Sequence, residues 1–193
     1  MKKDIILAGV GGQGILSIAA TIGMAAIKKG WHMKQAEVHG MSQRGGDVQS
    51  NLRLSDQEVA SDLIPKGQVD IILSVEPMES LRYVPMLSPT GWLITNTKPF
   101  INIPNYPEMD AIIAEIEKVP HHVLLDADQV AKDMGSPRSA NIVMLGAASP
   151  YLGLTADELE GAITAIFQRK GQEIVDQNIA AFRKGRELAE AQA

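Results

Sequence analysis

The chain has 193 residues, of which 45% are apolar, and its formal net charge is −5. This is enough for one α/β domain with a sizeable core, and the apolar fraction excludes a disordered tail. Scattered Lys and Arg on an acidic chain exclude a nucleic-acid footprint, and no apolar run approaches the ~20 residues of a membrane helix.

The first predicted elements are a strand, a glycine-rich turn and a helix. The apolar run 4–8 is typical of a buried strand, and the Ala- and Ile-rich run 15–29 predicts a helix. In this context Gly9 permits a tight turn, Gly11 a close backbone approach and Gly14 close helix–strand packing. A helix N-terminus also suits an anion. The turn between the two elements reads Gly9, Val10, Gly11, Gly12, Gln13, Gly14.

This turn alone does not establish dinucleotide binding. The dinucleotide fingerprint needs an acidic residue at the end of the second strand, about 20 residues on, to hold a ribose. Glu37, near the end of the strand predicted for 33–38, is the only candidate, and it opens a polar motif instead. The turn can therefore bind a dinucleotide, serve packing, or approach a ligand held by a partner.

The polar motif is the most informative segment of the chain. It combines a carboxylate, an imidazole, an amide, a guanidinium and three glycines within a few residues. Glycine allows another surface to approach, and an arginine fork suits carboxylates and phosphates. The pattern is typical of a recognition segment, although a tight turn with a solvated arginine remains an alternative. The residues are Glu37, Val38, His39, Gly40, Met41, Ser42, Gln43, Arg44, Gly45, Gly46, Asp47 and Val48.

The rest of the chain alternates between strands and helices. A half-exposed strand at 48–54 should be antiparallel to its neighbour, because the connection is short. The alternation predicts an α/β fold: a doubly wound, mostly parallel, Rossmann-like sheet with helices on both faces and a helical C-terminal segment. Further strands are predicted at 69–75, 91–96 and 123–126, a loop at 102–107, and helices at 77–87, 110–118, 139–148, 155–170 (opened by a capping box at Thr155) and 173–191.

The absence of cysteine limits the chemistry of this chain. A cysteine nucleophile, a disulfide and a cysteine-held iron–sulfur cluster are all excluded. The histidines are not spaced as a ligand pair, so no metal site is predicted. Any electron carriers would lie on another chain. The amino terminus has no signal-peptide pattern, and we expect a cytoplasmic protein.

The two glycine-bearing segments together resemble the gamma-type subunit of 2-oxoacid:ferredoxin oxidoreductases. The form of the motif between His39 and Arg44 is most similar to the small (beta) subunit of the indolepyruvate type, because the pyruvate and 2-oxoglutarate types usually carry a proline there. The resemblance spans nearly the whole chain. It rests on the segments 9–14 and 37–46, Val48, Arg53, the block 141–147, Asn178, Ala181, Phe182 and Gly185.

The resemblance implies one gamma-type domain over residues 1–193 and a role in oxidative decarboxylation of an arylpyruvate to an acyl-CoA, with electrons passed to ferredoxin. It implies a large alpha subunit that holds thiamine diphosphate and 4Fe-4S clusters, with coenzyme A as co-substrate. The isolated chain is expected to be inactive. Whether it forms a homodimer is left undecided by the sequence. Neither nucleic acid nor a membrane is an expected partner.

The resemblance also suggests where the site lies. We expect the two glycine-bearing segments side by side at the carboxyl edge of the sheet, against the large subunit. Arg44 would pair with a carboxylate of the substrate or partner or with a phosphate of coenzyme A, and Glu37 or His39 would orient Arg44 or a substrate group. An interface salt bridge is the alternative for Arg44. The candidate binding residues are Gly9, Gly11, Gly12, Gln13, Gly14, Gly40, Met41, Ser42, Gln43, Arg44, Gly45, Gly46 and Asn141.

Asn141 has two interpretations, a contact with the partner or a local bond to the backbone. Two other functions also remain open for the chain. One is a free-standing NAD(P)-dependent dehydrogenase, which the missing ribose-binding acid disfavours. The other is a nucleotide or coenzyme A sensor without catalysis, which the His39–Gly46 motif disfavours.

Overall fold

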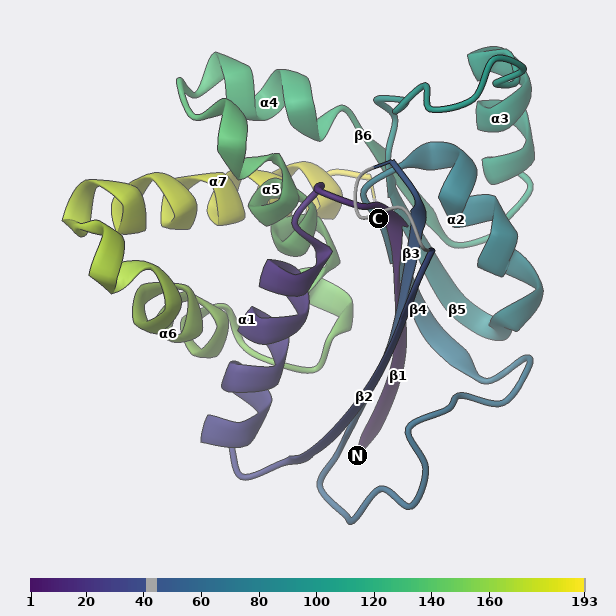
Figure 1. Ribbon diagram of the computed structural model, residues 1–193. Coiled ribbons are helices and arrows are strands. Elements are labelled where there is room, and N and C mark those ends of the chain that lie inside the picture. The colour runs from purple at the N-terminus through teal and green to yellow at the C-terminus, as the bar shows by residue number, and fades with distance from the viewer. Residues whose placement is uncertain (41–44, 193) are drawn as a thin grey trace.

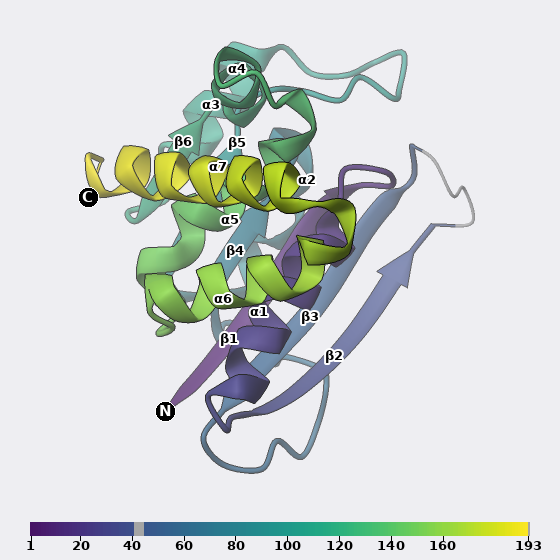
Figure 2. The same cartoon turned by 90° about the vertical axis from the view of Figure 1, so that its left-hand side faces the viewer.

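The computed structural model describes residues 1–40 and 45–192. Within them the strands form one six-stranded sheet in the order β2-β3-β1-β4-β5-β6 (Figures 1 and 2). β1 pairs in parallel with β4, β4 with β5, and β5 with β6, whereas β3 is antiparallel to both β1 and β2. The strands are β1 (Lys2–Val10), β2 (His32–His39), β3 (Asp47–Ser55), β4 (Val69–Ser74), β5 (Leu87–Asn96) and β6 (His122–Leu125).

Helices cover both faces of this sheet. In Figure 1, α2 and α3 lie on one side of the strands, and α1, α5, α6 and α7 lie on the other. The mostly parallel α/β fold with a helical C-terminal segment is therefore confirmed. The helices are α1 (Ile15–Lys28), α2 (Pro77–Tyr83), α3 (Met109–Ile116), α4 (Ala127–Asp133), α5 (Ala140–Ala148), α6 (Ala156–Phe167) and α7 (Gln172–Glu190).

The central strand β1 is buried on both faces, and its alternate side chains enter two different cores. Ile5 and Leu7 belong to the larger core, which includes residues of α1, α5, α6 and α7. Ile6 and Ala8 belong to the smaller core with residues of α2 and α3. A strand covered on both faces reads as a continuous apolar run, which is why its sequence predicted a buried strand.

β2 and β3 form an antiparallel pair at one edge of the sheet. The predicted antiparallel strand is thus confirmed, and Val10 at the end of β1 pairs with Asp47 at the start of β3. As a result, the strand that follows α1 does not neighbour β1, because β3 lies between them. The end of β2 and the start of β3 reach the same edge as the carboxyl ends of the parallel strands.

α5 is the central helix of the larger core, and small residues let it approach α7. Every residue from Ile142 to Ala148 is buried. A Cβ added at Gly146 would overlap the carbonyl oxygen of Phe182, and one added at Gly185 would overlap that of Val143. Glycine at these two points therefore permits backbone-to-backbone packing that alanine would obstruct.

Some element boundaries differ from the prediction. The helix predicted for 77–87 ends at Tyr83 and is followed by a 3-10 turn, Val84–Met86, so that β5 begins at Leu87 and not at 91. α4 was not predicted, because its seven residues are mostly polar. Its signal was present: the Asp126 side chain accepts a hydrogen bond from Gln129 N, an N-cap pattern.

The capping box predicted at Thr155 is confirmed. Its hydroxyl accepts a hydrogen bond from Glu158 N at 3.2 Å, and the Glu158 carboxylate accepts one from Thr155 N at 2.8 Å. The helix that it opens ends at Phe167, with a 3-10 turn, Gln168–Lys170, after it. Across the described ranges, no helix has both the length and the apolar character needed to cross a membrane.

Candidate functional site

The glycine turn connects β1 to α1 and is fixed from within by Gln13. The Gln13 side-chain oxygen accepts a hydrogen bond from Val10 N at 2.7 Å, and its amide nitrogen donates to Val75 O at 3.3 Å. Gly14 is the N-cap of α1, with φ 83°, and no side chain caps the helix. The turn is therefore held against the end of β4 by an internal amide.

The second glycine-bearing segment contacts the first directly. Gly11 N donates to Gly46 O at 2.8 Å, and Gly45 N approaches Gly11 O at 3.5 Å. Gly45 has φ 82°, a left-handed conformation that glycine adopts without strain. At the base of the segment, Gly40 N donates to Asp47 O at 3.1 Å. The structure thus brings Gly11, Gly45 and Gly46 together at the carboxyl edge of the sheet, while Met41, Ser42, Gln43 and Arg44 lie outside the described residues.

Glu37 and His39 lie at the end of β2, at the same edge of the sheet. Their side chains are 3.5 Å apart, from His39 Nδ1 to Glu37 Oε1, and His39 is the more exposed of the two. Both line a cavity of about 480 Å³ between the β2–β3 pair and the start of α1. Its other lining residues are Val10, Gly11, Gly12, Gly14, Ile15, Leu16 and Val48. This cavity is mostly apolar, with one acid–imidazole pair at its rim.

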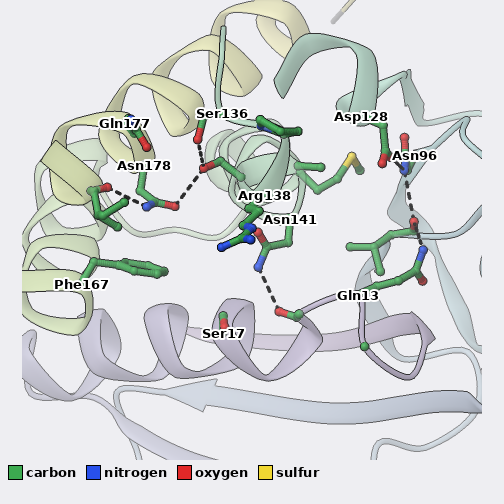
Figure 3. A pocket seen from close by; sticks show the side chains of 18 of the residues that line it. Gln13, Ser17, Asn96, Asp128, Ser136, Arg138, Asn141, Phe167, Gln177 and Asn178 are labelled. Carbon is green, nitrogen blue, oxygen red and sulfur yellow. Dashed lines mark hydrogen bonds between the residues drawn. The ribbon is translucent and has the colours of Figure 1, made fainter. Parts of the chain in front are cut away.

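A larger cavity of about 720 Å³ lies on the other side of the glycine turn (Figure 3). It is enclosed by the turn and the start of α1, by the 3-10 turn Pro137–Ser139 and α5, and by α7. Gln13, Ser17, Arg138 and Asn141 line it from these elements, and Lys170 adds a second cation. The cavity lies where β1, β4 and β5 end, which is the usual ligand position in an open α/β sheet.

Hydrogen bonds between side chains order the walls of the larger cavity. On one side, Asn96 Nδ2 donates to Asp128 Oδ2 at 2.7 Å and to Val75 O at 3.2 Å, and Val75 O is also the acceptor of Gln13. On the other side, the Ser136 and Ser139 hydroxyls bond to each other at 2.7 Å, and Ser139 donates to Asn178. The walls thus carry preorganised polar groups with two cations, Arg138 and Lys170, and one carboxylate, Asp128, which is bonded to Asn96. This mixture suits a polar ligand that bears both anionic and hydrogen-bond-donor groups.

Asn141 bonds within the chain. Its Nδ2 donates to the carbonyl oxygen of Gly14 at 3.2 Å, as Figure 3 shows, so it ties α5 to the N-terminus of α1. Of the two interpretations, the local bond is the one present in the structure. Asn96 and Asp128 were not singled out in the sequence, and Asn178 was named only as part of the family resemblance. Asn96 could have been, because it is a polar residue at the carboxyl end of a predicted strand.

A buried acid lies near the second glycine-bearing segment. Burial raises the pKa of Glu79 above its usual 4.5, an effect that Arg82 opposes and that the nearby Glu76 and Asp47 carboxylates reinforce. Arg82 Nε lies 2.7 Å from Glu79 Oε2, so the guanidinium lowers the pKa mainly through its charge. Burial also raises the pKa of Tyr83 to about 12. Among residues 1–40 and 45–192, no three His, Asp or Glu side chains are grouped as metal ligands.

Comparison with known proteins identifies the class of this fold and site. Residues 4–188 match the family model described as pyruvate ferredoxin/flavodoxin oxidoreductase. The chain therefore belongs to the pyruvate ferredoxin/flavodoxin oxidoreductase family.

Individual relatives that the chain resembles over almost the full length of both chains are small subunits of 2-oxoacid oxidoreductases. The chain is 36% identical to the indolepyruvate oxidoreductase subunit IorB of Archaeoglobus fulgidus, over 96% of this chain and 94% of the relative. It is 30% identical to the 2-oxoglutarate synthase subunit KorC of Methanothermobacter marburgensis, over 97% of each. The crystal structure of the keto/oxoacid ferredoxin oxidoreductase gamma subunit of Geobacter sulfurreducens superposes with a TM-score of 0.72 at 26% identity, over 98% of this chain and 99% of that one.

Proposed function

We propose that this chain is the small subunit of a 2-oxoacid:ferredoxin oxidoreductase that acts on indolepyruvate or related arylpyruvates. The observation that carries the proposal is the 36% identity with an indolepyruvate oxidoreductase subunit over almost the full length of both chains. The whole span 1–193 would act as one gamma-type domain. In the proposed reaction a 2-oxoacid, coenzyme A and two oxidised ferredoxins give an acyl-CoA, carbon dioxide, two reduced ferredoxins and a proton.

The proposed role of the chain is to complete the active site of a large alpha subunit. The contact of Gly11 with Gly45 and Gly46 supports a single docking face at the carboxyl edge of the sheet. Glycine leaves the backbone there open to close approach by another chain. We assign Glu37, His39 and Arg44 to orientation of an anion at this face, either the substrate carboxylate or a phosphate of coenzyme A, with the remaining residues of both segments as partner contacts.

The cofactors of the proposed complex belong to the large subunit. Thiamine diphosphate would supply the decarboxylation chemistry, and 4Fe-4S clusters would carry the electrons to ferredoxin. This chain has no cysteine to ligate a cluster. Its own contribution is therefore to bind and orient groups at the docking face and to exclude water from it. Such a ferredoxin-linked complex would work in the cytoplasm.

Two alternatives are weaker. A gamma subunit of a pyruvate- or 2-oxoglutarate-type enzyme shares the fold, but the identity to a 2-oxoglutarate synthase subunit is lower, at 30%. A stand-alone NAD(P)-dependent dehydrogenase needs a ribose-binding acid at the end of a strand beside β1. Here the strand beside β1 on that side is the antiparallel β3, and Glu37 lies one strand further out. Titration of the isolated chain with NADH or NADPH, followed by tryptophan fluorescence, tests this alternative.

The activity is tested by reconstitution. A tagged form of this chain is co-expressed with a candidate large subunit that carries a thiamine motif and ferredoxin-like cysteine clusters, and the anaerobic complex is assayed for dye reduction. We expect coenzyme A-dependent reduction with indolepyruvate and less with pyruvate or 2-oxoglutarate. Turnover by the large subunit alone at the same rate, or nicotinamide turnover by the isolated chain, would contradict the proposal.

The role of Arg44 is tested in the same complex. Arg44→Ala should raise the KM for coenzyme A or for the 2-oxoacid, whereas Arg169→Ala, which removes an exposed cation from the 3-10 turn after α6, serves as the matched control. If Arg44→Ala weakens assembly and leaves both KM values unchanged, the residue is an interface salt bridge and the ligand role is wrong.

A further inference from the structure

The loop that joins β5 to α3, residues 97–108, reaches back to the glycine-bearing segments. In Figure 1 it runs above the carboxyl ends of the strands, next to α2. Three of its large apolar side chains point outward: Phe100 is 41% exposed, Ile101 is 71% exposed and Ile103 is 36% exposed. A loop that turns these side chains to solvent is not held by burying them. Apart from Tyr106, which packs against the smaller core, the loop therefore depends on polar contacts for its position.

Glu76 supplies the first of these contacts. It lies two residues after the end of β4, and its side chain is fully buried. One carboxylate oxygen caps α2 by accepting from Glu79 N at 2.8 Å. The other oxygen accepts from Phe100 N at 3.2 Å and from the Tyr106 hydroxyl. Burial and the neighbouring carboxylate raise the pKa of Tyr106, so this hydroxyl keeps its proton. One buried carboxylate thus holds the loop at two points, six residues apart.

Asn102 lies between those two points and makes the contact with the glycine-bearing segment. Its Nδ2 donates to the carbonyl oxygen of Gly45 at 2.8 Å. The amide of Gly45 approaches Gly11 O, and Gly11 N donates to Gly46 O. Hydrogen bonds at both ends of the loop segment 100–106, joined by its backbone, therefore connect Glu76 to the junction of the two glycine-bearing segments.

We propose that Asn102 and Glu76 are positioning residues, which fix the Gly45–Gly46 backbone against the glycine turn at Gly11. Neither residue lies within the two glycine-bearing segments, and each acts through other residues. Glu76 anchors the loop, and the anchored loop presents the Asn102 amide at a fixed place. Because the ends of the loop are already ordered, the exposed bond to Gly45 costs little further conformational entropy. The consequence for turnover rests on the proposed function, but the positioning itself does not.

The positioning role is tested on the isolated chain by amide hydrogen exchange, resolved by residue in NMR spectra. Asn102→Asp has nearly the same shape but puts an acceptor opposite the Gly45 carbonyl. We expect the amides of Gly11 and Gly45 to exchange roughly three to ten times faster, the factor for one hydrogen bond of ordinary net strength. Asn105→Asp makes the same chemical change at an exposed position of the same loop and should leave both rates unchanged.

A second pair of variants tests the anchor. Tyr106→Phe removes a single donor to Glu76 and should speed exchange at the same two glycines, by a smaller factor than Asn102→Asp. Tyr151→Phe is the matched control, because the Tyr151 hydroxyl is buried without a hydrogen-bond partner among the described residues. A purely structural role would lower the unfolding temperature without selective exchange at the glycines, and that result would overturn the proposal.

The reconstituted complex separates this inference from the proposed function. If both are right, Asn102→Asp lowers kcat/KM with indolepyruvate and Asn105→Asp does not. If glycine exchange rises in Asn102→Asp but the complex with the native chain shows no turnover, positioning stands and the proposed function fails. If the native complex turns over and Asn102→Asp changes neither exchange nor kcat/KM, the inference is wrong.

Discussion

Replacing Gly14 and Asn141, singly and together, tests the contact that ties the glycine turn to α5. Gly14 has φ 83°, and a Cβ added there would lie 2.5 Å from Asn141 Nδ2. An alanine in this left-handed region costs about 1–2 kcal/mol. The Asn141 amide must also turn away, so Gly14→Ala loses its bond to the Gly14 carbonyl, for about 1 kcal/mol more. We expect Gly14→Ala to lower the free energy of unfolding by about 2–3 kcal/mol.

The single variant Asn141→Ala loses the same bond but gains helix propensity in α5, so its net cost is about 0.5 kcal/mol. The double variant loses the bond only once. It should therefore be about 1 kcal/mol more stable than the sum of the two single effects, and the propensity gain cancels from this difference. Urea unfolding of the four proteins measures it. Additivity within about 0.3 kcal/mol would show that the two residues are not in contact and would refute the reasoning.

Two further predictions concern the core and the buried acid. Gly185→Ala should destabilise the protein by about 1–3 kcal/mol, because its Cβ would overlap the Val143 carbonyl oxygen, whereas Gly161→Ala in α6, with open space around it, should stabilise by about 0.5 kcal/mol. Equal effects in urea unfolding would contradict the close packing of α5 on α7. The raised pKa of Glu79 means that the folded state binds this proton more tightly than the unfolded state does. The contribution of Glu79 to the free energy of unfolding is therefore complete below the usual pKa of 4.5 and is lost as pH rises through the folded-state pKa. Glu79→Gln should therefore gain stability relative to the native chain between pH 4 and pH 7, and a relative loss over that range would contradict the assignment.

Much of the fold follows from local patterns. The continuous apolar run of β1 indicated a buried strand, and Thr155 marked the start of α6. The alternation at 48–54 indicated a strand, and the short connection made it antiparallel, but the predicted half-exposure was wrong because β3 lies inside the sheet and residues 50–52, 54 and 55 are buried. These signals depend on neighbours a few residues away. The position of β3 between β2 and β1 does not depend on such local signals. The same alternating pattern would be seen whichever strand of the hairpin paired with β1. α4 was missed because seven mostly polar residues give no apolar period.

The site was less predictable than the fold. The two glycine-bearing segments could be found in the sequence, because their residue types are unusual for ordinary turns. The residues that hold them could not, since Asn102 bonds to Gly45 across 57 positions and Asn141 to Gly14 across 127. Asn96 and Asp128 likewise meet only after the sheet has formed. Such pairs depend on tertiary structure, and a single sequence carries no local signal for them.

The most direct test of the docking face is amide hydrogen exchange of this chain, free and bound to its large subunit. The joined glycine-bearing segments should be covered by the partner, so we predict slower exchange at Gly11, Gly45 and Gly46 in the complex. Unchanged exchange at all three, with new protection at the opposite end of the sheet near Asp56, would contradict the central claim.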